Sequence, residues 1–333
     1  MAIHTFELTK KLTHNEFKEI RKSLKRKHFS SGKNKTKIEI EKYSSRGIRI
    51  YLMSHKYYPC IRFVVNPTAI LDNGNVTDIF SEPDKLIDIV RLFDTYISDL
   101  FGNECLFENL KLTRLDLCTD LQLSSCEEVR KYIRLLYKSN MKKGYKVKGR
   151  KCENYDTESG FACDNPTAGI GISIYDKEAQ LLKIRKLSAA KKVGNRLRVE
   201  VQLKSQKSLR KYCEHDSNIE KIRYFLDCGQ ILLSKILDDL LVNADYYTLP
   251  EAIGIVCERK SGKMRDRMVR LLEMTSAYHS IRLAVKALKS EEPSITDKYV
   301  RLMLQSFHSL NVNVVTLGRR SRLKLLKSLL KQI

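Results

Sequence analysis

Three short segments place acids, bases and a tyrosine on what we expect to be one face of a β-sheet. Residues 114–120, 171–177 and 198–202 alternate apolar and polar side chains with a period of two, as strands with one buried face do. The polar positions are Arg114, Asp116, Cys118, Ser173, Tyr175, Lys177, Arg198, Glu200 and Gln202. The apolar positions, which we expect in the core, are Leu115, Leu117, Ile172, Ile174, Val199 and Val201. Carboxylates, cations and a phenol on one face of a sheet favour phosphoryl-transfer chemistry.

The chain is strongly basic. Its 333 residues include 62 Lys and Arg against 39 Asp and Glu, which gives a formal net charge of +23. A protein with this much positive charge needs an anionic partner, and nucleic acid is the commonest one. The 42% of hydrophobic residues is typical of a folded chain with a substantial core.

Other classes of protein are disfavoured by the sequence. Apolar runs fall short of the roughly 18 residues that span a bilayer, and the first residues lack the order of a signal peptide. We therefore expect a cytoplasmic protein with no membrane partner. The nine cysteines contain no C-x-x-C pair, and the seven histidines contain no H-x-H or H-E-x-x-H motif. A catalytic ion would therefore be held by carboxylates.

We expect an α+β fold with two domains. Residues 1–215 are predicted to form a catalytic domain, an antiparallel sheet with flanking helices, because β-rich runs at 36–43, 48–53 and 60–65 join the three segments above. Residues 216–333 are predicted to form an all-helical DNA-binding or accessory domain. Apolar spacing there indicates helices at 222–241, 264–288, 296–307 and 323–330.

Clusters of Lys and Arg are predicted to neutralise DNA phosphates. A loop and the C-terminal stretch contribute Lys142, Lys143, Lys146, Lys148, Arg150, Lys151, Arg319, Arg320 and Arg322, and a further cluster covers residues 21–37. Two other interpretations stay open. Charge runs are usually solvated surface, and the stretch at 323–331 also has the pattern of an amphipathic helix on a membrane surface.

Four segments, in this order, resemble rolling-circle replication initiators of small Gram-positive plasmids and conjugative transposons, which are related to the gene II proteins of filamentous phage. They are Arg-Phe-Val-Val-Asn-Pro at 62–67, Thr-Arg-Leu-Asp-Leu-Cys-Thr-Asp at 113–120, Ser-Ile-Tyr-Asp-Lys at 173–177 and Arg-Val-Glu-Val-Gln at 198–202. The resemblance covers roughly residues 45–205. It implies an enzyme that nicks and rejoins DNA at an origin, with a tyrosine that becomes linked to the 5′-phosphate.

The resemblance also implies roles for individual residues. Tyr175 is the candidate nucleophile, Asp116 and Glu200 are candidate ligands of Mg²⁺ or Mn²⁺, and Lys177, Arg114 and Arg198 are candidate phosphate contacts. Asp120 is a weaker metal candidate, because four strand residues span about 13 Å. The implied partner is origin DNA, single-stranded or as a hairpin or supercoiled duplex. A host helicase and a second copy of this chain stay open as partners.

Alternatives stay open at this point. The segment after Lys177 holds no second tyrosine, and Tyr155, Tyr246 and Tyr247 are reserve nucleophiles. A non-catalytic origin-binding or regulatory protein with a decayed active site needs only the basic clusters. A tyrosine recombinase is suggested by His279-x-x-Arg282 followed by Tyr299, although that fold has no place for the strand set. Positive charge alone does not distinguish DNA from RNA.

Overall fold

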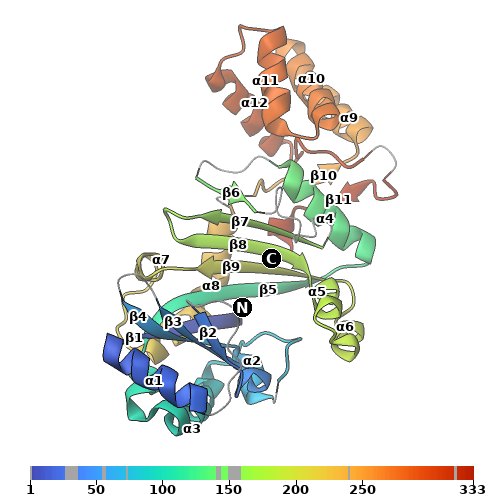
Figure 1. Ribbon diagram of the computed structural model, residues 1–333. Coiled ribbons are helices and arrows are strands. Elements are labelled where there is room, and N and C mark those ends of the chain that lie inside the picture. The colour runs from blue at the N-terminus through green and yellow to red at the C-terminus, as the bar shows by residue number, and fades with distance from the viewer. Residues whose placement is uncertain are drawn as a thin grey trace.

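A large antiparallel sheet organises the molecule (Figure 1). The computed structural model describes residues 2–26, 37–54, 58–72, 74–139, 144–148, 159–238, 241–318 and 321–333. Its main sheet has the strand order β2-β3-β4-β1-β5-β9-β8-β7-β6. The strands are β1 (Ala2–Lys11), β2 (Lys37–Ile40), β3 (Ile48–Ser54), β4 (Pro59–Val65), β5 (Lys111–Gln122), β6 (Lys146–Val147), β7 (Gly160–Asn165), β8 (Ile170–Asp176) and β9 (Arg196–Leu203).

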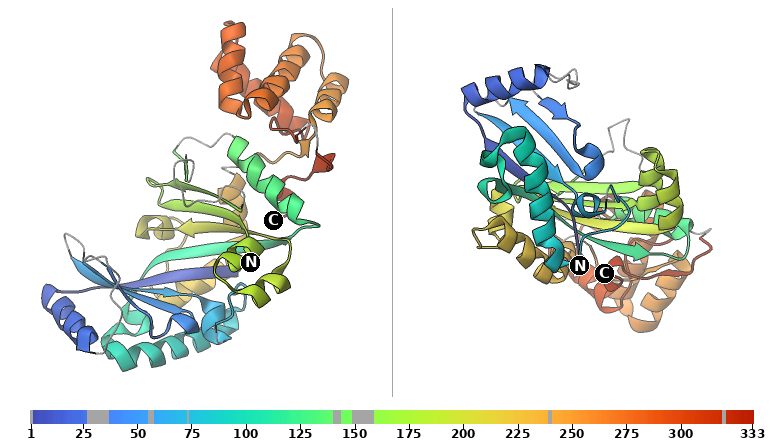
Figure 2. Two further views of the ribbon diagram at one scale, coloured as in Figure 1. Left: turned by 45° about the vertical axis from the view of Figure 1, so that its right-hand side comes forward. Right: turned by 90° about the horizontal axis from the view of Figure 1, so that it is seen from below.

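Helices cover the apolar face of this sheet. The helices of this part are α1 (His14–Arg26), α2 (Pro67–Leu71), α3 (Leu86–Phe101), α4 (Cys126–Lys138), α5 (Lys177–Lys183), α6 (Leu187–Val193), α7 (Gln206–Arg210) and α8 (Asn218–Asp238). Helix α8 packs on β1, β5 and β9, and α4 packs on β7 and β8. Helix α3 reaches the sheet through Phe93, whose ring lies 5.5 Å from that of Phe63 on β4. Figure 2 shows α3 and α8 on the same side of the strands.

The three segments with alternating side chains are neighbouring strands, as predicted. They form β5, β9 and β8, and every apolar position predicted for the core is at most 1% exposed. The pattern works because a strand with one buried face must alternate, whatever its neighbours are. The predicted runs at 48–53 and 60–65 are likewise confirmed as β3 and β4, and the run at 36–43 is confirmed as β2 over Lys37–Ile40, after which the chain turns.

The C-terminal part is mainly helical. It contains α9 (Leu249–Arg259), α10 (Gly262–Tyr278), α11 (Ile281–Glu291), α12 (Asp297–Ser309) and the short strand pair β10 (Tyr246–Tyr247) and β11 (Leu325–Leu326). Helix α10 contacts α9, α11 and α12, and this group stands beyond the edge of the sheet at β6 (Figure 1). No helix in the described part of the chain combines the length and hydrophobicity needed to cross a bilayer.

One helix prediction in this part is wrong, and another is confirmed with a break. Residues 323–330 do not form an α-helix, because Leu325 and Leu326 pair with β10 and the Ser328 amide donates to the buried carboxylate of Asp245 at 2.7 Å; a single 3-10 turn follows at Leu329–Lys331. Those backbone groups find tertiary partners instead of helical ones. The run at 264–288 is two helices, because His279 adopts a left-handed conformation (φ 52°) and Ser280 caps α11.

Candidate active site on the polar face of the sheet

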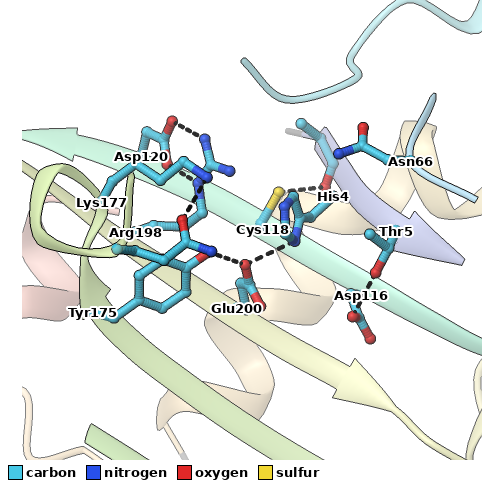
Figure 3. Close-up of polar contacts among 12 residues, drawn as sticks. His4, Thr5, Asn66, Asp116, Cys118, Asp120, Tyr175, Lys177, Arg198 and Glu200 are labelled. Carbon is cyan, nitrogen blue, oxygen red and sulfur yellow. Dashed lines mark hydrogen bonds and ion pairs between the residues drawn. The ribbon is translucent and has the colours of Figure 1, made fainter. Parts of the chain in front are cut away.

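The strand order brings the predicted site residues into contact range. In the register of β5, β9 and β8, Glu200 lies between Cys118 and Ser173, and Arg198 lies between Asp120 and Tyr175. Residues directly opposite on neighbouring strands have Cβ atoms about 5 Å apart. The polar face therefore gathers residues from three separate chain segments, as the alternation predicts (Figure 3).

At the centre of this face, Tyr175 contacts Glu200. The Tyr175 hydroxyl donates to Oε1 of Glu200 at 2.6 Å. Nδ1 of His4, on β1, lies 2.9 Å from the same oxygen. Glu200 is 4% exposed, so its charge depends mainly on these protein partners. The result is a connected His4–Glu200–Tyr175 cluster (Figure 3).

The electrostatics of this cluster hold Glu200 ionised and Tyr175 protonated. Burial opposes charge on Glu200, but His4, the Tyr175 hydroxyl and Arg198 together outweigh it and lower its pKa to about 2. Burial of the hydroxyl and the neighbouring Glu200 charge raise the pKa of Tyr175 well above its ordinary value, although Arg198 opposes this. A phenol in this state needs a base before it can attack, and Glu200 already accepts its hydrogen bond.

Arg198 is held by Asp120. Its side chain is fully buried, and Nε and Nη2 donate to the two carboxylate oxygens of Asp120 at 2.7 and 2.8 Å. Nη2 also donates to the carbonyl of Thr77 at 2.7 Å, and Arg196 lies 3.4 Å from Asp120. The Asp120 carboxylate is therefore engaged by two arginines, and its predicted role as a metal ligand stays a prediction.

Lys177 is the second buried cation of the face. It is the first residue of α5, whose N-terminus is capped by Asp176 through the Ala179 amide at 3.0 Å. Its side chain is 1% exposed, and its ammonium donates to Gln180 at 2.8 Å. Burial, with the charge of Arg198, lowers the pKa of Lys177 to about 8. A lysine in this range exchanges its proton near neutral pH.

Asp116 belongs to a neighbouring ion-pair group. Nε and Nη2 of Arg114 donate to its two oxygens at 2.7 and 2.8 Å, and the Thr5 hydroxyl donates at 2.7 Å. Arg114 also reaches Glu7 at 3.2 Å. Burial raises the pKa of Asp116 against the pull of Arg114, and the charge of Glu200 raises it further. Asp116 and Glu200 are thus electrostatic neighbours, and their role as shared metal ligands stays a prediction.

A pocket opens beside Tyr175. Its volume is about 330 Å³, and its lining includes His4, Ser173, Tyr175, Gln180, Lys183 and Glu200. The Tyr175 side chain is partly exposed while its hydroxyl is turned toward Glu200. The pocket therefore gives a ligand access to the Tyr175–Glu200 pair from solvent.

Glu200 is the carboxylate around which the predicted divalent cation would bind. In the described ranges, no three His, Cys, Asp or Glu side chains converge closely enough to hold a metal ion by themselves. Mg²⁺ needs less than this, because it commonly keeps several waters and binds one or two carboxylates together with substrate phosphates. Glu200 and Asp116 would supply the carboxylates, and His4 a nitrogen donor.

The structure describes only some of the predicted DNA contacts. Lys146, Lys148 and Arg322 are exposed, and Lys148 pairs with Asp164. The remaining residues lie outside the described ranges: Lys142, Lys143, Arg150, Lys151, Arg319 and Arg320. Of the reserve nucleophiles, Tyr155 also lies outside them, and burial raises the pKa of Tyr246 to about 12.

Sequence reasoning missed His4 and Thr5, which contact Glu200 and Asp116. Both lie on β1, which pairs with β4 and β5 in the middle of the sheet and was not predicted as a strand. The available signal was the alternation of Phe6 and Leu8 with polar neighbours. Register irregularities before Thr5 and before Leu8 interrupt that alternation, which is why the pattern is weak.

Comparisons with known proteins find a distant likeness to a solved structure. No protein-family model and no curated protein matches the sequence. Among solved structures, the rolling circle replication initiator protein from Geobacillus stearothermophilus is similar, with a TM-score of 0.36 and 14% identity over 72% of this chain and 84% of that chain. Because both values are this low, the function proposed below rests on the residues of the site.

Proposed function

We propose that this protein nicks and rejoins DNA through a phosphotyrosine intermediate at Tyr175 and thereby initiates rolling-circle replication of a plasmid, phage or mobile element. One observation carries the proposal: the Tyr175 hydroxyl donates a 2.6 Å hydrogen bond to the buried, ionised Glu200 beside an open pocket. A nucleophile already bonded to a base is the arrangement that covalent catalysis requires.

The proposed reaction uses this pair directly. The phenol proton passes along the hydrogen bond to Glu200 as the Tyr175 oxygen forms a bond to the phosphorus of the scissile phosphodiester; the negative charge of the bound DNA phosphate would raise the pKa of Glu200 from its low resting value and so make it a better base. The bond from phosphorus to the 3′-oxygen breaks, and the strand end leaves as a 3′-hydroxyl after it gains a proton. Rejoining runs the same steps in reverse, with a 3′-hydroxyl attacking the phosphotyrosine. His4 holds Glu200 in place through its 2.9 Å contact.

Two buried cations favour this chemistry. Burial and the charge of Glu200 raise the pKa of Tyr175, and the positive charge of Arg198 opposes this rise. Arg198 therefore makes the Tyr175 phenolate easier to form. Lys177, with its pKa lowered to about 8, is the candidate donor of the proton that the 3′-oxygen gains. Arg114 is the candidate contact for a phosphate next to the scissile one.

A divalent cation, Mg²⁺ or Mn²⁺, would be held by Glu200 and Asp116, with His4 as a nitrogen donor. It would polarise a phosphoryl oxygen and offset the negative charge of the two carboxylates. Outside the site, the basic segments at 142–151 and 319–322 would bind DNA phosphates. Helices α9 to α12 would form the accessory DNA-binding part of the chain.

The decisive experiment looks for a covalent adduct. The protein is incubated with Mn²⁺ and a library of circular single-stranded DNAs that carry randomised hairpins, and the reaction is stopped with SDS. The DNA that remains covalently bound is then sequenced, and the peptide to which it is linked is identified by mapping. We expect an adduct on Tyr175 that Tyr175→Phe abolishes. The matched control is Tyr137→Phe, which removes a hydroxyl that donates to the Gly160 carbonyl at 2.9 Å and leaves the adduct intact.

The non-catalytic alternative makes the opposite prediction. An origin-binding protein with a decayed site would bind certain DNAs of the library, and the Tyr175→Phe variant would bind the same DNAs with equal affinity. Neither protein would form a covalent adduct with any of them. The raised pKa of Tyr175 is what favours this second candidate. An adduct on another tyrosine would keep the activity and overturn the assignment of Tyr175.

A further inference from the structure

The corner between α5 and α6 exposes an unusual number of apolar side chains. Leu182, Ile184 and Leu187 are 47%, 51% and 62% exposed. Single exposed leucines are ordinary, but three large apolar side chains within six residues form a patch that usually marks a binding surface. Arg185, at the centre of the corner, adopts a left-handed backbone conformation (φ 59°), which a non-glycine residue takes up only at some cost.

The same corner is purely basic. Between Ala179 and Arg196 the sequence contains no Asp or Glu, and its cations are Lys183, Arg185, Lys186, Lys191, Lys192 and Arg196. Apolar side chains framed by cations suit a ligand that presents flat apolar groups on an anionic backbone. Unpaired nucleic acid is such a ligand, because its bases are exposed and its phosphates are close by.

The corner also connects two pockets. Lys183 lines the pocket of Tyr175, and Lys186 lines a second pocket of about 450 Å³ between α6 and the loop before Phe80. Lys192 and Arg196 line this second pocket too, and Asp78 is the acid among its lining residues. Arg196 is tied to the active site through its 3.4 Å contact with Asp120. A chain that leaves Tyr175 over this corner therefore passes Lys183 at the edge of the first pocket and reaches the three cations of the second.

We propose that the α5–α6 corner binds the single-stranded DNA segment next to the scissile phosphate. The bases lie against Leu182, Ile184 and Leu187, and a phosphate occupies the second pocket between Lys186, Lys192 and Arg196. This proposal rests on the proposed nicking function for its choice of DNA. It requires an unpaired strand, because a duplex presents phosphates and sugars on its outside and hides the faces of its bases.

The test measures binding separately from chemistry. Fluorescein-labelled dT20 and a 20-base-pair duplex are titrated with the full chain carrying Tyr175→Phe, and anisotropy is followed at several salt concentrations. We expect Ile184→Ser/Leu187→Ser to weaken dT20 binding about tenfold, which corresponds to ~1.4 kcal/mol, and to leave duplex binding unchanged. The matched control is Ile87→Ser, which alters an exposed isoleucine on α3, away from every proposed DNA contact.

The phosphate contacts have their own readout. We expect Lys186→Gln/Lys192→Gln to reduce the slope of log Kd against log salt for dT20 by about 1.4, since each lost single-strand contact removes ~0.7. The control Lys42→Gln/Arg91→Gln removes the same charge from exposed pairs with Asp99 and Asp88 and leaves the slope unchanged.

Four results overturn the proposal: no binding of dT20, an unaltered affinity in the serine variant, equal losses for duplex and dT20, or equal effects of the controls. Loss of dT20 binding in the corner variants, together with no adduct in the covalent assay, would keep the corner as a single-strand site and reject nicking. The two proposals therefore fail independently.

Discussion

Asp120 is expected to stabilise the fold by holding Arg198, and the substitution Asp120→Asn tests this. The change keeps the size of the side chain and removes its charge. Arg198 is fully buried and makes two short bonds to the Asp120 carboxylate, so the substitution leaves a guanidinium in the interior with the Thr77 carbonyl as its remaining strong acceptor. Removing one partner of a buried ion pair costs roughly 3–5 kcal/mol.

That loss is large compared with the total stability of a folded chain, about 5–15 kcal/mol. Urea unfolding followed by circular dichroism measures it directly. With a slope of about 2–3 kcal/mol per molar urea, we expect the midpoint of the transition to fall by about 1–2 M. The control Asp99→Asn breaks an exposed pair with Lys42 and shifts stability by no more than about 0.5 kcal/mol.

The competing role of Asp120 as a metal ligand gives a different result. A stability loss below about 1 kcal/mol together with weaker Mn²⁺ binding, measured by electron paramagnetic resonance, would refute the ion-pair reasoning. A large stability loss with Mn²⁺ affinity unchanged in the folded fraction would assign Asp120 to the support of Arg198.

The remaining predictions concern a buried lysine and the cysteines. Because burial lowers the pKa of Lys177 from 10.5 to about 8, the unfolded chain binds more protons between these values, and the free energy of unfolding rises there by up to about 3 kcal/mol. The substitution Lys177→Met is expected to abolish this rise in the free energy of unfolding and to make the protein more stable than the native chain at pH 7.5. Urea unfolding at pH 7.5 and 9.5 checks both expectations. An unchanged pH dependence of the unfolding free energy in this variant would contradict the argument from burial. Among the described cysteines, brief iodoacetamide treatment at pH 8 followed by peptide mass spectrometry is expected to label the exposed Cys126 and Cys257. The same treatment is expected to spare Cys105 and Cys163, since burial raises the pKa values of their thiols to about 11 and 12. Rapid labelling of these two cysteines would show that the structure around them opens.

The strands that carry the site were predictable because their signal is local. Alternation in β5, β8 and β9 specifies which side chains share a face, and Tyr175, Glu200 and Arg198 are neighbours as a consequence. Which strands pair depends on residues that are far apart in the sequence. The pairing of β5, β8 and β9 was predictable only because all three segments carry charged or polar side chains on one face.

The contribution of β1 was not predictable in this way. Its register shifts twice against β5, so its apolar residues do not keep a strict period of two. Its central position is set by pairing with β4 and β5, which the sequence of β1 does not encode locally. His4 consequently enters the site from a segment that carried no motif.

The partners of the acids decide which part of the polar face is suited to chemistry. Asp116 and Asp120 each accept two bonds from one arginine, and an arginine does not give up its proton in a protein. Glu200 differs, because its short contacts are with a histidine and a tyrosine, both of which exchange protons. Carboxylates that are buried, like Asp116 and Glu200, or half-buried, like Asp120, need partners that balance their charge. The arginine pairs therefore hold the face in place. In the proposed mechanism, the proton transfer would take place between Tyr175 and Glu200, with Lys177, whose pKa burial lowers to about 8, as the nearby cation.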